Sequence, residues 1–369
     1  MSSALGRYKS LPKMARSYLD PSQVGYLILY VTNRCNFRCE FCFYYAEIEK
    51  GKKPNELTLE ELEKLSQSIG PLVQLSLTGG EPFLRKDLDE IYGMFVRNCQ
   101  ARYITIPTNG SLPEPMMRFL EKVLPAYPDS YLRLTFSIDG IGQDHDSARS
   151  MPGSFEKIER SYKLISPLRK RFSNLVLDAN SVFTSRSEDK LMQTLQYLEG
   201  NFNFDNLSIT YARGDIKDPS LLASSEEKYT EVNEYLESLE RKKEGRFLYP
   251  LWRAVRDVSR ENLIRTVFHD EFVTPCVAGR KLIVIGETGE VYPCEILDRK
   301  MGNLRDYGFS LPRLLAQSKN EELRRWIVKS ECKCSFECAL AANVVWKPKN
   351  YPKVISSAIK NIGKNHLDH

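Results

Sequence analysis

The first two hundred residues repeat one plan six times, and this repetition limits the folds that the chain can adopt. In each repeat a short apolar run ends in a polar or glycine-rich turn, and a helical pattern follows. The runs start roughly 25 to 45 residues apart, which is the scale of one strand–helix unit. The six runs cover residues 26–32, 72–77, 103–106, 132–136, 175–183 and 207–211. Strands that alternate with helices predict an α/β fold with a parallel sheet, either open or curled into a partial (β/α)6 barrel like part of a TIM barrel.

The segments between the runs carry helix signals. Thr58 and Glu61 have the spacing of a capping box, in which each side chain bonds the backbone N–H of the other residue. Similar helical patterns cover residues 86–98, 113–124, 154–170 and 187–199. In folds of this kind the functional groups gather at the carboxyl ends of the parallel strands, so we expect the chemistry there.

The composition changes after the sixth run. A polar, mostly helical connection rich in Glu, Lys and Arg leads into a hairpin pattern with five cysteines, whose turn places Gly289 where φ > 0 is needed. We therefore expect five parts: an N-terminal extension (1–23), the partial barrel (24–215), a helical linker (216–270), a small α+β module (271–345) and a basic tail (346–369). The apolar stripe of residues 354–362 predicts a tail helix that docks on the module rather than on an anionic membrane.

The bulk charge excludes some classes of partner. The net charge is +5 over 369 residues, which permits an anionic substrate but lacks the strong basic excess typical of nucleic-acid binding. The first twenty residues have no apolar signal-peptide core, and no run is long enough to span a membrane. These features predict a soluble, cytoplasmic protein with no transmembrane segment and no nucleic-acid partner.

Nine cysteines fall into two clusters and one isolated position. In a chain without a secretory signal, clustered cysteines indicate metal binding before disulfides. Cys99 stands alone in a helical pattern and is predicted to be a buried, inert thiol.

The first cluster directly follows the first apolar run. Cys35, Cys39 and Cys42 have the spacing C-x3-C-x2-C. Three thiolates can hold three irons of a [4Fe–4S] cluster and leave the fourth iron open, which is typical of a catalytic rather than a structural centre. A structural zinc site or buried thiols are the alternatives, but zinc prefers four ligands in paired C-x2-C knuckles. Arg34 and Arg38 flank the loop, and nearby cations favour the reduced cluster.

This cysteine motif, with the aromatic Phe41 before its third cysteine, resembles the signature of the radical S-adenosylmethionine (SAM) superfamily. The resemblance implies that the open iron binds the amino and carboxylate groups of SAM and that Phe41 packs by the adenine. It also implies reductive cleavage of SAM to a 5′-deoxyadenosyl radical, which abstracts hydrogen from a substrate.

Turn residues at the other strand ends extend the resemblance. The second run ends in Gly79, Gly80, Glu81 and Pro82, where two glycines allow close approach of a ligand and Glu81 offers an acceptor. This segment resembles the family's GGEP motif, which holds the SAM amino group. The resemblance further suggests SAM contacts at Asn109, at Ser137 and Asp139 (ribose), and at Asn180, Ser181 and Arg213 (carboxylate). Ordinary turn chemistry is the alternative, and His145, Asp146 and Arg149 are predicted to be caps or surface pairs.

The second cluster follows the hairpin and has the spacing C-x12-G-x4-C, then C-x-C-x3-C. Its cysteines are Cys276, Cys294, Cys332, Cys334 and Cys338. The pattern resembles the auxiliary-cluster modules called SPASM and twitch, although a full SPASM module has seven cysteines. We expect one auxiliary [4Fe–4S] cluster held by Cys276, Cys294 and Cys338, with Cys332 or Cys334 as the fourth ligand. Zinc is the alternative. A fully ligated cluster could take an electron from a substrate radical in a net oxidation, as in an oxidoreductase, and one with an open site could bind substrate.

The substrate is the least defined part of the prediction. About 24 residues precede the first predicted strand, which leaves no room for an N-terminal peptide-recognition domain and favours a small-molecule substrate. A peptide or protein side chain is the alternative substrate, and a non-catalytic iron–sulfur or zinc protein is the alternative class. A one-electron reductant such as flavodoxin or ferredoxin is the expected partner, and no catalytic acid or base is identified.

Overall fold

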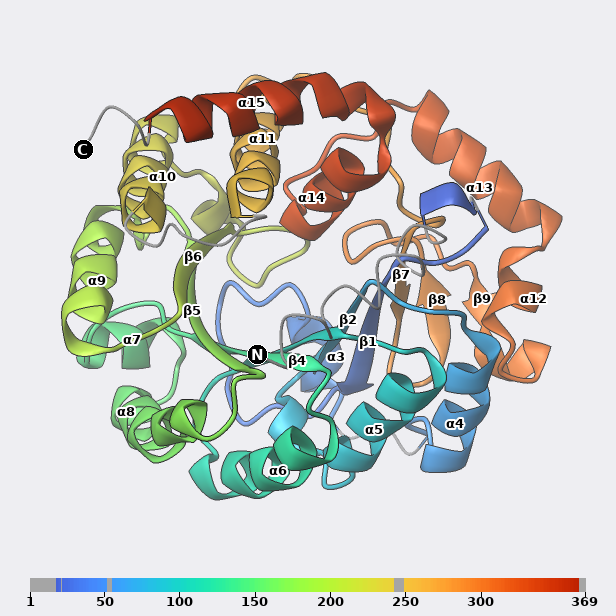
Figure 1. Ribbon diagram of the computed structural model, residues 1–369, viewed down its shortest axis with the longest axis horizontal. Coiled ribbons are helices and arrows are strands. Elements are labelled where there is room, and N and C mark those ends of the chain that lie inside the picture. The colour runs from blue at the N-terminus through green and yellow to red at the C-terminus, as the bar shows by residue number, and fades with distance from the viewer. Residues whose placement is uncertain (1–17, 21, 52–54, 242–248, 365–369) are drawn as a thin grey trace.

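A nine-stranded sheet organises the computed structural model, which describes residues 18–20, 22–51, 55–241 and 249–364. The strand order is β6-β5-β4-β3-β2-β1-β7-β8-β9. The first six strands are parallel and curve into a barrel that does not close (Figure 1). They are β1 (Tyr26–Thr32), β2 (Gln74–Gly79), β3 (Tyr103–Thr108), β4 (Tyr131–Ser137), β5 (Leu175–Phe183) and β6 (Asn206–Tyr211). The predicted partial α/β barrel is therefore confirmed.

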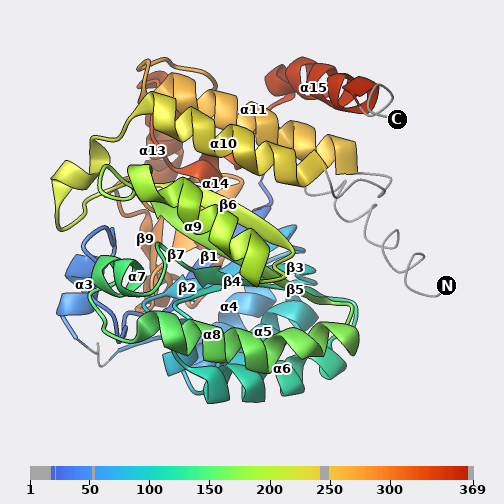
Figure 2. The ribbon, with the colours of Figure 1, turned by 90° about the vertical axis from the view of Figure 1, so that its left-hand side faces the viewer.

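Helices cover the convex side of the barrel strands (Figures 1 and 2). They are α4 (Leu59–Ser68), α5 (Leu88–Asn98), α6 (Pro113–Ala126), α8 (Ser154–Ile165) and α9 (Glu188–Asn201). Short helices α3 (Tyr45–Glu49) and α7 (Gln143–Ala148) follow the carboxyl ends of β1 and β4. The predicted capping box is confirmed, because Thr58 Oγ1 accepts the Glu61 N–H at 3.2 Å and Glu61 Oε2 accepts the Thr58 N–H at 2.9 Å.

The five cysteines of the second cluster lie in a segment that extends the barrel sheet. Strand β7 (Leu282–Ile285) pairs with β1 in parallel and with β8 (Glu290–Tyr292) in antiparallel fashion, and β9 (Gly302–Asn303) forms the edge. The helices after it are α12 (Leu311–Leu315), α13 (Ser318–Lys329) and α14 (Glu337–Trp346). Short 3-10 helices in the described residues cover Pro82–Leu84, Ser166–Lys170, Pro219–Leu222, Leu304–Tyr307 and Pro348–Asn350.

Strand β1 is buried on both faces, as expected for a central parallel strand. Leu27 and Leu29 belong to the core cluster under the barrel helices. Tyr26 and Tyr30 belong to a second cluster, together with the cysteines of the late segment and Phe336. The concave side of β1 is thus covered by the second cysteine segment.

The predicted tail helix docks on a different element from the one expected. Helix α15 (Tyr351–Lys364) lies along α11 (Tyr249–Val267), which follows α10 (Glu226–Arg241) in the helical linker (Figure 2). Lys353 pairs with Glu261 at 3.0 Å, and Ser357 donates to Asp257 at 2.9 Å. Docking is confirmed, but the partner is the linker because α11 stands between α15 and the barrel.

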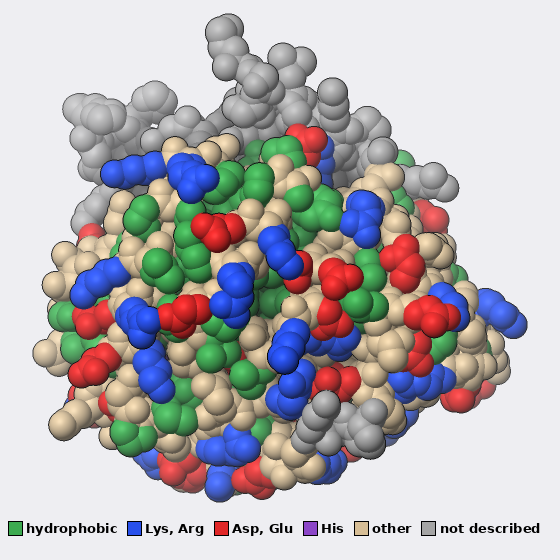
Figure 3. Space-filling view, turned by 90° about the horizontal axis from the view of Figure 1, so that it is seen from below, with side chains coloured by type: hydrophobic (Ala, Val, Ile, Leu, Met, Phe, Trp, Pro, Cys, Tyr) green, Lys and Arg blue, Asp and Glu red, His purple; other side chains and the backbone are tan. Residues whose placement is uncertain are grey.

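The surface agrees with the mild net charge. Acidic and basic side chains are interspersed on the face in Figure 3, without a broad area of one sign. Among the described helices, none has the length and apolar character that a bilayer crossing requires.

Candidate active site

The three-cysteine loop begins where β1 ends and lies against the turn after β2. The Gly80 N–H donates to Thr32 O, and the Glu81 N–H donates to Arg34 O, both at 2.8 Å. A Cβ atom on Gly79, whose φ is +128°, would lie 2.2 Å from Thr32 O, and one on Gly80 would lie 2.1 Å from Arg34 O. The two glycines therefore let the neighbouring strand ends touch, whereas their sequence pattern had suggested the approach of a ligand.

The three thiols Cys35, Cys39 and Cys42 lie close enough to affect one another's charge. Burial chiefly raises the pKa of Cys35 to about 12 and that of Cys42 to about 11, and neighbouring thiols add to both shifts. Burial also raises the pKa of Cys39, although Arg149 opposes the shift from 3.7 Å. Three neighbouring thiols with raised pKa values need a cationic group before they can ionise together.

The donor set of this loop is three thiols, which is the set that three irons of a four-iron cluster require. Within the described ranges, no three His, Cys, Asp or Glu side chains converge closely enough to hold a single metal ion.

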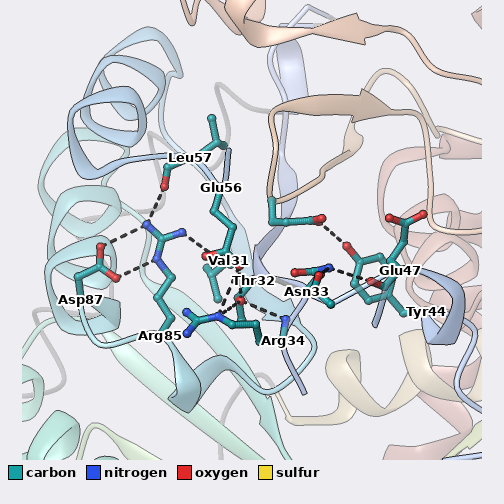
Figure 4. A network of polar contacts seen from close by, with 12 residues as sticks. Val31, Thr32, Asn33, Arg34, Tyr44, Glu47, Glu56, Leu57, Arg85 and Asp87 are labelled. Atoms are coloured by element: carbon teal, nitrogen blue, oxygen red, sulfur yellow. Dashed lines mark hydrogen bonds and ion pairs between the residues drawn. The ribbon is translucent and has the colours of Figure 1, made fainter. Parts of the chain in front are cut away.

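Figure 4 shows a polar network that fixes the start of the cysteine loop. The buried Arg85 guanidinium donates to Val31 O and Leu57 O, each at 2.7 Å, and pairs with Asp87. Asn33 Nδ2 donates to Glu47 O at 2.8 Å, which ties the loop to α3. Sequence reasoning missed Arg85, because one arginine after a turn carries no distinguishing pattern.

The flanking arginines also bond the loop itself. Arg34 Nε donates to Thr32 Oγ1 at 3.1 Å and lies 3.7 Å from Glu56. Arg38 Nη1 donates to Cys35 O and Phe37 O, both at 2.8 Å. Both cations therefore stay beside the thiols.

Glu81 joins the carboxyl ends of β2 and β3. One carboxylate oxygen accepts Thr108 Oγ1–H at 2.9 Å and the Phe83 N–H at 3.2 Å, and the other accepts the Asn109 N–H at 2.8 Å. Burial raises the pKa of Glu81 to about 7 against these bonds. Both oxygens are bonded within the protein, so Glu81 orders the strand ends. Asn109 Nδ2 donates to Asn36 Oδ1 at 2.9 Å and so reaches the cysteine loop.

The turn after β4 holds a buried ion pair beside Cys39. Asp139 pairs with Arg149, and its other oxygen accepts the Val182 N–H at 2.5 Å. The Arg149 guanidinium also lies 5.1 Å from the centre of the Phe41 ring. The prediction of a cap or surface pair was wrong for Arg149, because α7 folds this residue back onto the cysteine loop.

The two neighbours of Arg149 have structural roles. His145 is fully buried and its Nδ1 accepts the Asp139 N–H at 3.1 Å. Burial, followed by the Arg149 charge, lowers the pKa of His145 to about 3. Asp146 accepts the N–H groups of Gly153 and Phe155 at 2.6 and 2.9 Å, so the predicted cap is confirmed for this residue.

The predicted SAM contacts on β4 and β5 divide between the two faces of the sheet. Ser137 and Asn180 are register partners and half-buried, and Asn180 Oδ1 accepts the hydroxyls of Ser208 and Thr210 on β6. Ser181 is fully buried among the residues of the helix-covered face and donates to Ile138 O at 2.5 Å. Alternation along the strand places Ser137 and Asn180 on the concave face and Ser181 on the other face.

Arg213 follows β6 and is paired inside the protein. Its Nη2 lies 2.9 Å from Glu295 Oε2, and its guanidinium lies between the rings of Phe43 and Phe336. The charge that the family resemblance assigned to the SAM carboxylate is therefore bonded to the carboxylate next to Cys294.

The five cysteines of the second cluster all pack in one group of side chains. Cys276, Cys294 and Cys332 raise the pKa of the Cys334 thiol, which burial chiefly moves to about 12. Burial chiefly raises the pKa of the Cys338 thiol to about 11, and the Tyr26 hydroxyl of β1 lies 3.6 Å from its sulfur.

Comparison with known proteins agrees with this site. The family model described as the Radical SAM superfamily matches residues 29–198. A GTP 3′,8-cyclase of Stenotrophomonas maltophilia (strain K279a) is 31% identical over 179 residues, which are 47% of this chain and 51% of that protein. A GTP 3′,8-cyclase of Clostridium botulinum (strain Okra / Type B1) is 30% identical over 141 residues, which are 38% of this chain and 42% of that protein. The matches thus span about half the length of these curated relatives.

Solved structures share the fold. The structure described as native anSMEcpe with bound AdoMet has a TM-score of 0.59 and 19% identity, with 93% of this chain and all (100%) of that chain covered. Streptococcus suis SuiB bound to S-adenosylmethionine has a TM-score of 0.59 and 16% identity, with 86% and 71% covered.

The partial α/β barrel holds three thiols in the loop after β1, the donor set that three irons of a four-iron cluster require. Residues 29–198 match the radical SAM superfamily, and these matches indicate an enzyme that catalyses a radical-mediated reaction. This confirms the resemblance drawn from the cysteine motif.

Proposed function

We propose that this enzyme cleaves SAM reductively and directs the resulting radical to a small-molecule substrate. The triad of Cys35, Cys39 and Cys42 in the loop after β1, of which Cys39 is buried and the other two are half-buried, carries the proposal. These thiols would hold a [4Fe–4S] cluster, which with SAM bound supplies a 5′-deoxyadenosyl radical.

The protein's own residues bind and orient. Ser137 and Asn180 face the concave side and are the candidates for hydrogen bonds to SAM, and Phe41 offers its ring to the adenine. Glu81, Asp139 and Arg149 act one step back, because their polar atoms already bond the protein. They keep the strand ends and the cysteine loop in one arrangement before SAM arrives.

Four of the late cysteines support an auxiliary cluster. Cys276, Cys294, Cys332 and Cys334 supply four thiols, which is a full ligand set, and Cys338 stays outside it. A centre without an open position suits electron removal from a substrate radical, and so a net oxidation. The proposed module still resembles a SPASM or twitch module, but its fourth ligand is a second late cysteine in place of Cys338.

Two features favour a small substrate. The curated relatives that match are named GTP 3′,8-cyclase, and GTP is a small anionic molecule. The net charge of +5 is compatible with such a substrate. A one-electron donor such as flavodoxin or ferredoxin would serve as reductant.

Anaerobic SAM cleavage tests the proposal. The reconstituted protein, given dithionite and SAM, should form 5′-deoxyadenosine, and the triple variant Cys35→Ala, Cys39→Ala, Cys42→Ala should form none. Cys99→Ala is the matched control, because Cys99 is buried in the helix layer, where its thiol donates to Ser66 O at 3.1 Å. If a wild-type sample with a full iron content forms no 5′-deoxyadenosine, the proposal is contradicted. Turnover of a co-purified peptide instead of a small molecule would move the substrate class to the peptide alternative.

A further inference from the structure

Arg213 lies where three segments of the chain meet. It leaves the carboxyl end of β6 and pairs with Glu295 of the second cysteine segment, with 2.9 Å between Nη2 and Oε2. The two side chains are only 14% and 6% exposed. A buried ion pair persists only with well-defined geometry, since both charges have left water.

The guanidinium also bridges the two cysteine loops through aromatic rings. It lies 4.8 Å from the centre of the Phe43 ring and 5.0 Å from that of Phe336. Phe43 follows Cys42 directly, and Phe336 comes two residues after Cys334. Cation–π contacts with the two rings hold the two loops against one flat, charged group.

The residues after Arg213 close on the same loop. Gly214 has φ of +72°, and a Cβ atom there would lie 3.1 Å from Phe43 Cβ. Further along, the N–H groups of Lys217 and Asp218 point to Glu40 O at 3.1 and 3.4 Å. The β6 end is therefore tied to the three-cysteine loop by backbone as well as side chain.

The second cysteine segment reaches the barrel at the same place. Glu295 Oε1 accepts the Tyr30 hydroxyl of β1 at 2.8 Å. Glu337 Oε1 accepts the Tyr211 N–H of β6 at 2.9 Å. Arg213 stands between these two anchors. Glu295 directly follows Cys294, and Glu337 directly precedes Cys338.

We propose that Arg213 is a positioning residue that fixes the second cysteine set against the three-cysteine loop and so sets the separation of the two iron–sulfur centres. The inference rests on the proposed function, in which both sets hold clusters. It replaces the role at the SAM carboxylate, because Glu295 already neutralises this guanidinium.

Magnetic coupling between the two centres tests the inference. In wild-type protein with both centres reduced, spin–spin interaction should broaden the EPR signals and speed their relaxation. Arg213→Gln and Glu295→Gln should each keep the wild-type iron content and lose most of this broadening. Amide hydrogen exchange over residues 330–338 should rise about tenfold in both variants, since the loop loses its anchor. Arg213→Lys, which keeps the charge but not the flat group, should fall between wild type and Arg213→Gln.

Arg186 provides the matched control. It pairs with Glu40 and with Asp218 at 3.1 Å on the same side of the molecule, but its side chain is 58% exposed. Arg186→Gln should leave the EPR broadening and the exchange of residues 330–338 at wild-type values.

Two results would overturn the inference. One is unchanged broadening and exchange in Arg213→Gln. The other is a weaker SAM-induced change in the EPR signal of the first centre with broadening intact, which would return Arg213 to the SAM carboxylate. A wild-type protein that assembles only one iron centre would count against the proposed function instead. If Arg213→Gln fails to fold, Arg213→Lys and Glu295→Gln give the same comparison.

Discussion

Individual residues around Cys39 carry charges that the fold has taken out of water. Arg149 and Asp139 neutralise each other there. His145 Nδ1 accepts a hydrogen bond from the Asp139 backbone N–H. His145 and Arg149 have no sequence signature, since His and Arg after a glycine turn are ordinary surface residues. Their role follows from burial alone.

Removing one partner of the buried pair should cost stability. In Asp139→Asn the Arg149 charge loses its partner, and we expect the free energy of unfolding to fall by about 3–5 kcal/mol, measured by denaturant titration. Arg160→Gln, in an exposed pair with Glu114, should change it by less than about 1 kcal/mol. Equal effects of the two substitutions would mean that the Asp139–Arg149 pair contributes no more than a surface contact.

His145 should make stability depend on pH. Its pKa is about 3 in the folded protein, below the ordinary value of 6.5, so the unfolded chain binds more protons between these two pH values. The free energy of unfolding should therefore decrease as the pH falls below 6.5, by up to about 1.4 kcal/mol per pH unit from this group. His145→Asn, which retains an acceptor for the Asp139 N–H, should show a shallower decrease. His269→Asn, at the surface beside Glu226, serves as control and should follow the wild-type curve.

At the scale of elements, strand ends and helix caps explain most of the local order. The turn after β2 depends on glycine because its backbone touches Thr32 O and Arg34 O. Gly200, near the end of α9, has no such role, because a Cβ atom added there would meet nothing within 4 Å.

The two glycines should therefore respond oppositely to alanine. Gly79→Ala adds a Cβ atom 2.2 Å from a backbone oxygen at φ of +128°, so we expect a loss of about 3 kcal/mol or more in the free energy of unfolding. Gly200→Ala should gain about 0.5 kcal/mol, because alanine restricts the unfolded chain and suits a helix. Denaturant midpoints of the two variants measure this, and a tolerated Gly79→Ala would contradict the close approach of β1 and β2.

At the scale of the whole molecule, strand β7 joins the second cysteine segment to the barrel through β1, and Arg213 with Glu295 completes the contact. The five late cysteines thereby share one buried cluster of side chains with Tyr26 and Tyr30, and Phe43 and Tyr44, which follow Cys42, pack against that cluster. We therefore expect a structural change in the second cysteine segment to alter the packing of the three-cysteine loop.

Iron content should separate the ligands from the spare thiol. With two four-iron centres, the reconstituted wild type should hold about eight irons per chain. Cys334→Ala should hold about four, because it removes a member of the proposed ligand set. Cys338→Ala should still hold about eight. The reverse pattern would restore the ligand set first expected from the spacing.

The sequence by itself determined the alternation of six strands and their helices, the Thr58 cap, and the cysteine motif that identifies the superfamily. These are local properties: periodicity, turn chemistry and spacing act between residues close in the chain. Only the tertiary structure decided that Ser181 faces away from the concave side, that Arg149 reaches Cys39, and that Arg213 pairs with Glu295. Each of these depends on contacts between segments far apart in sequence. In such contacts the partner of a side chain is set by its burial and its direction, and not by its residue type.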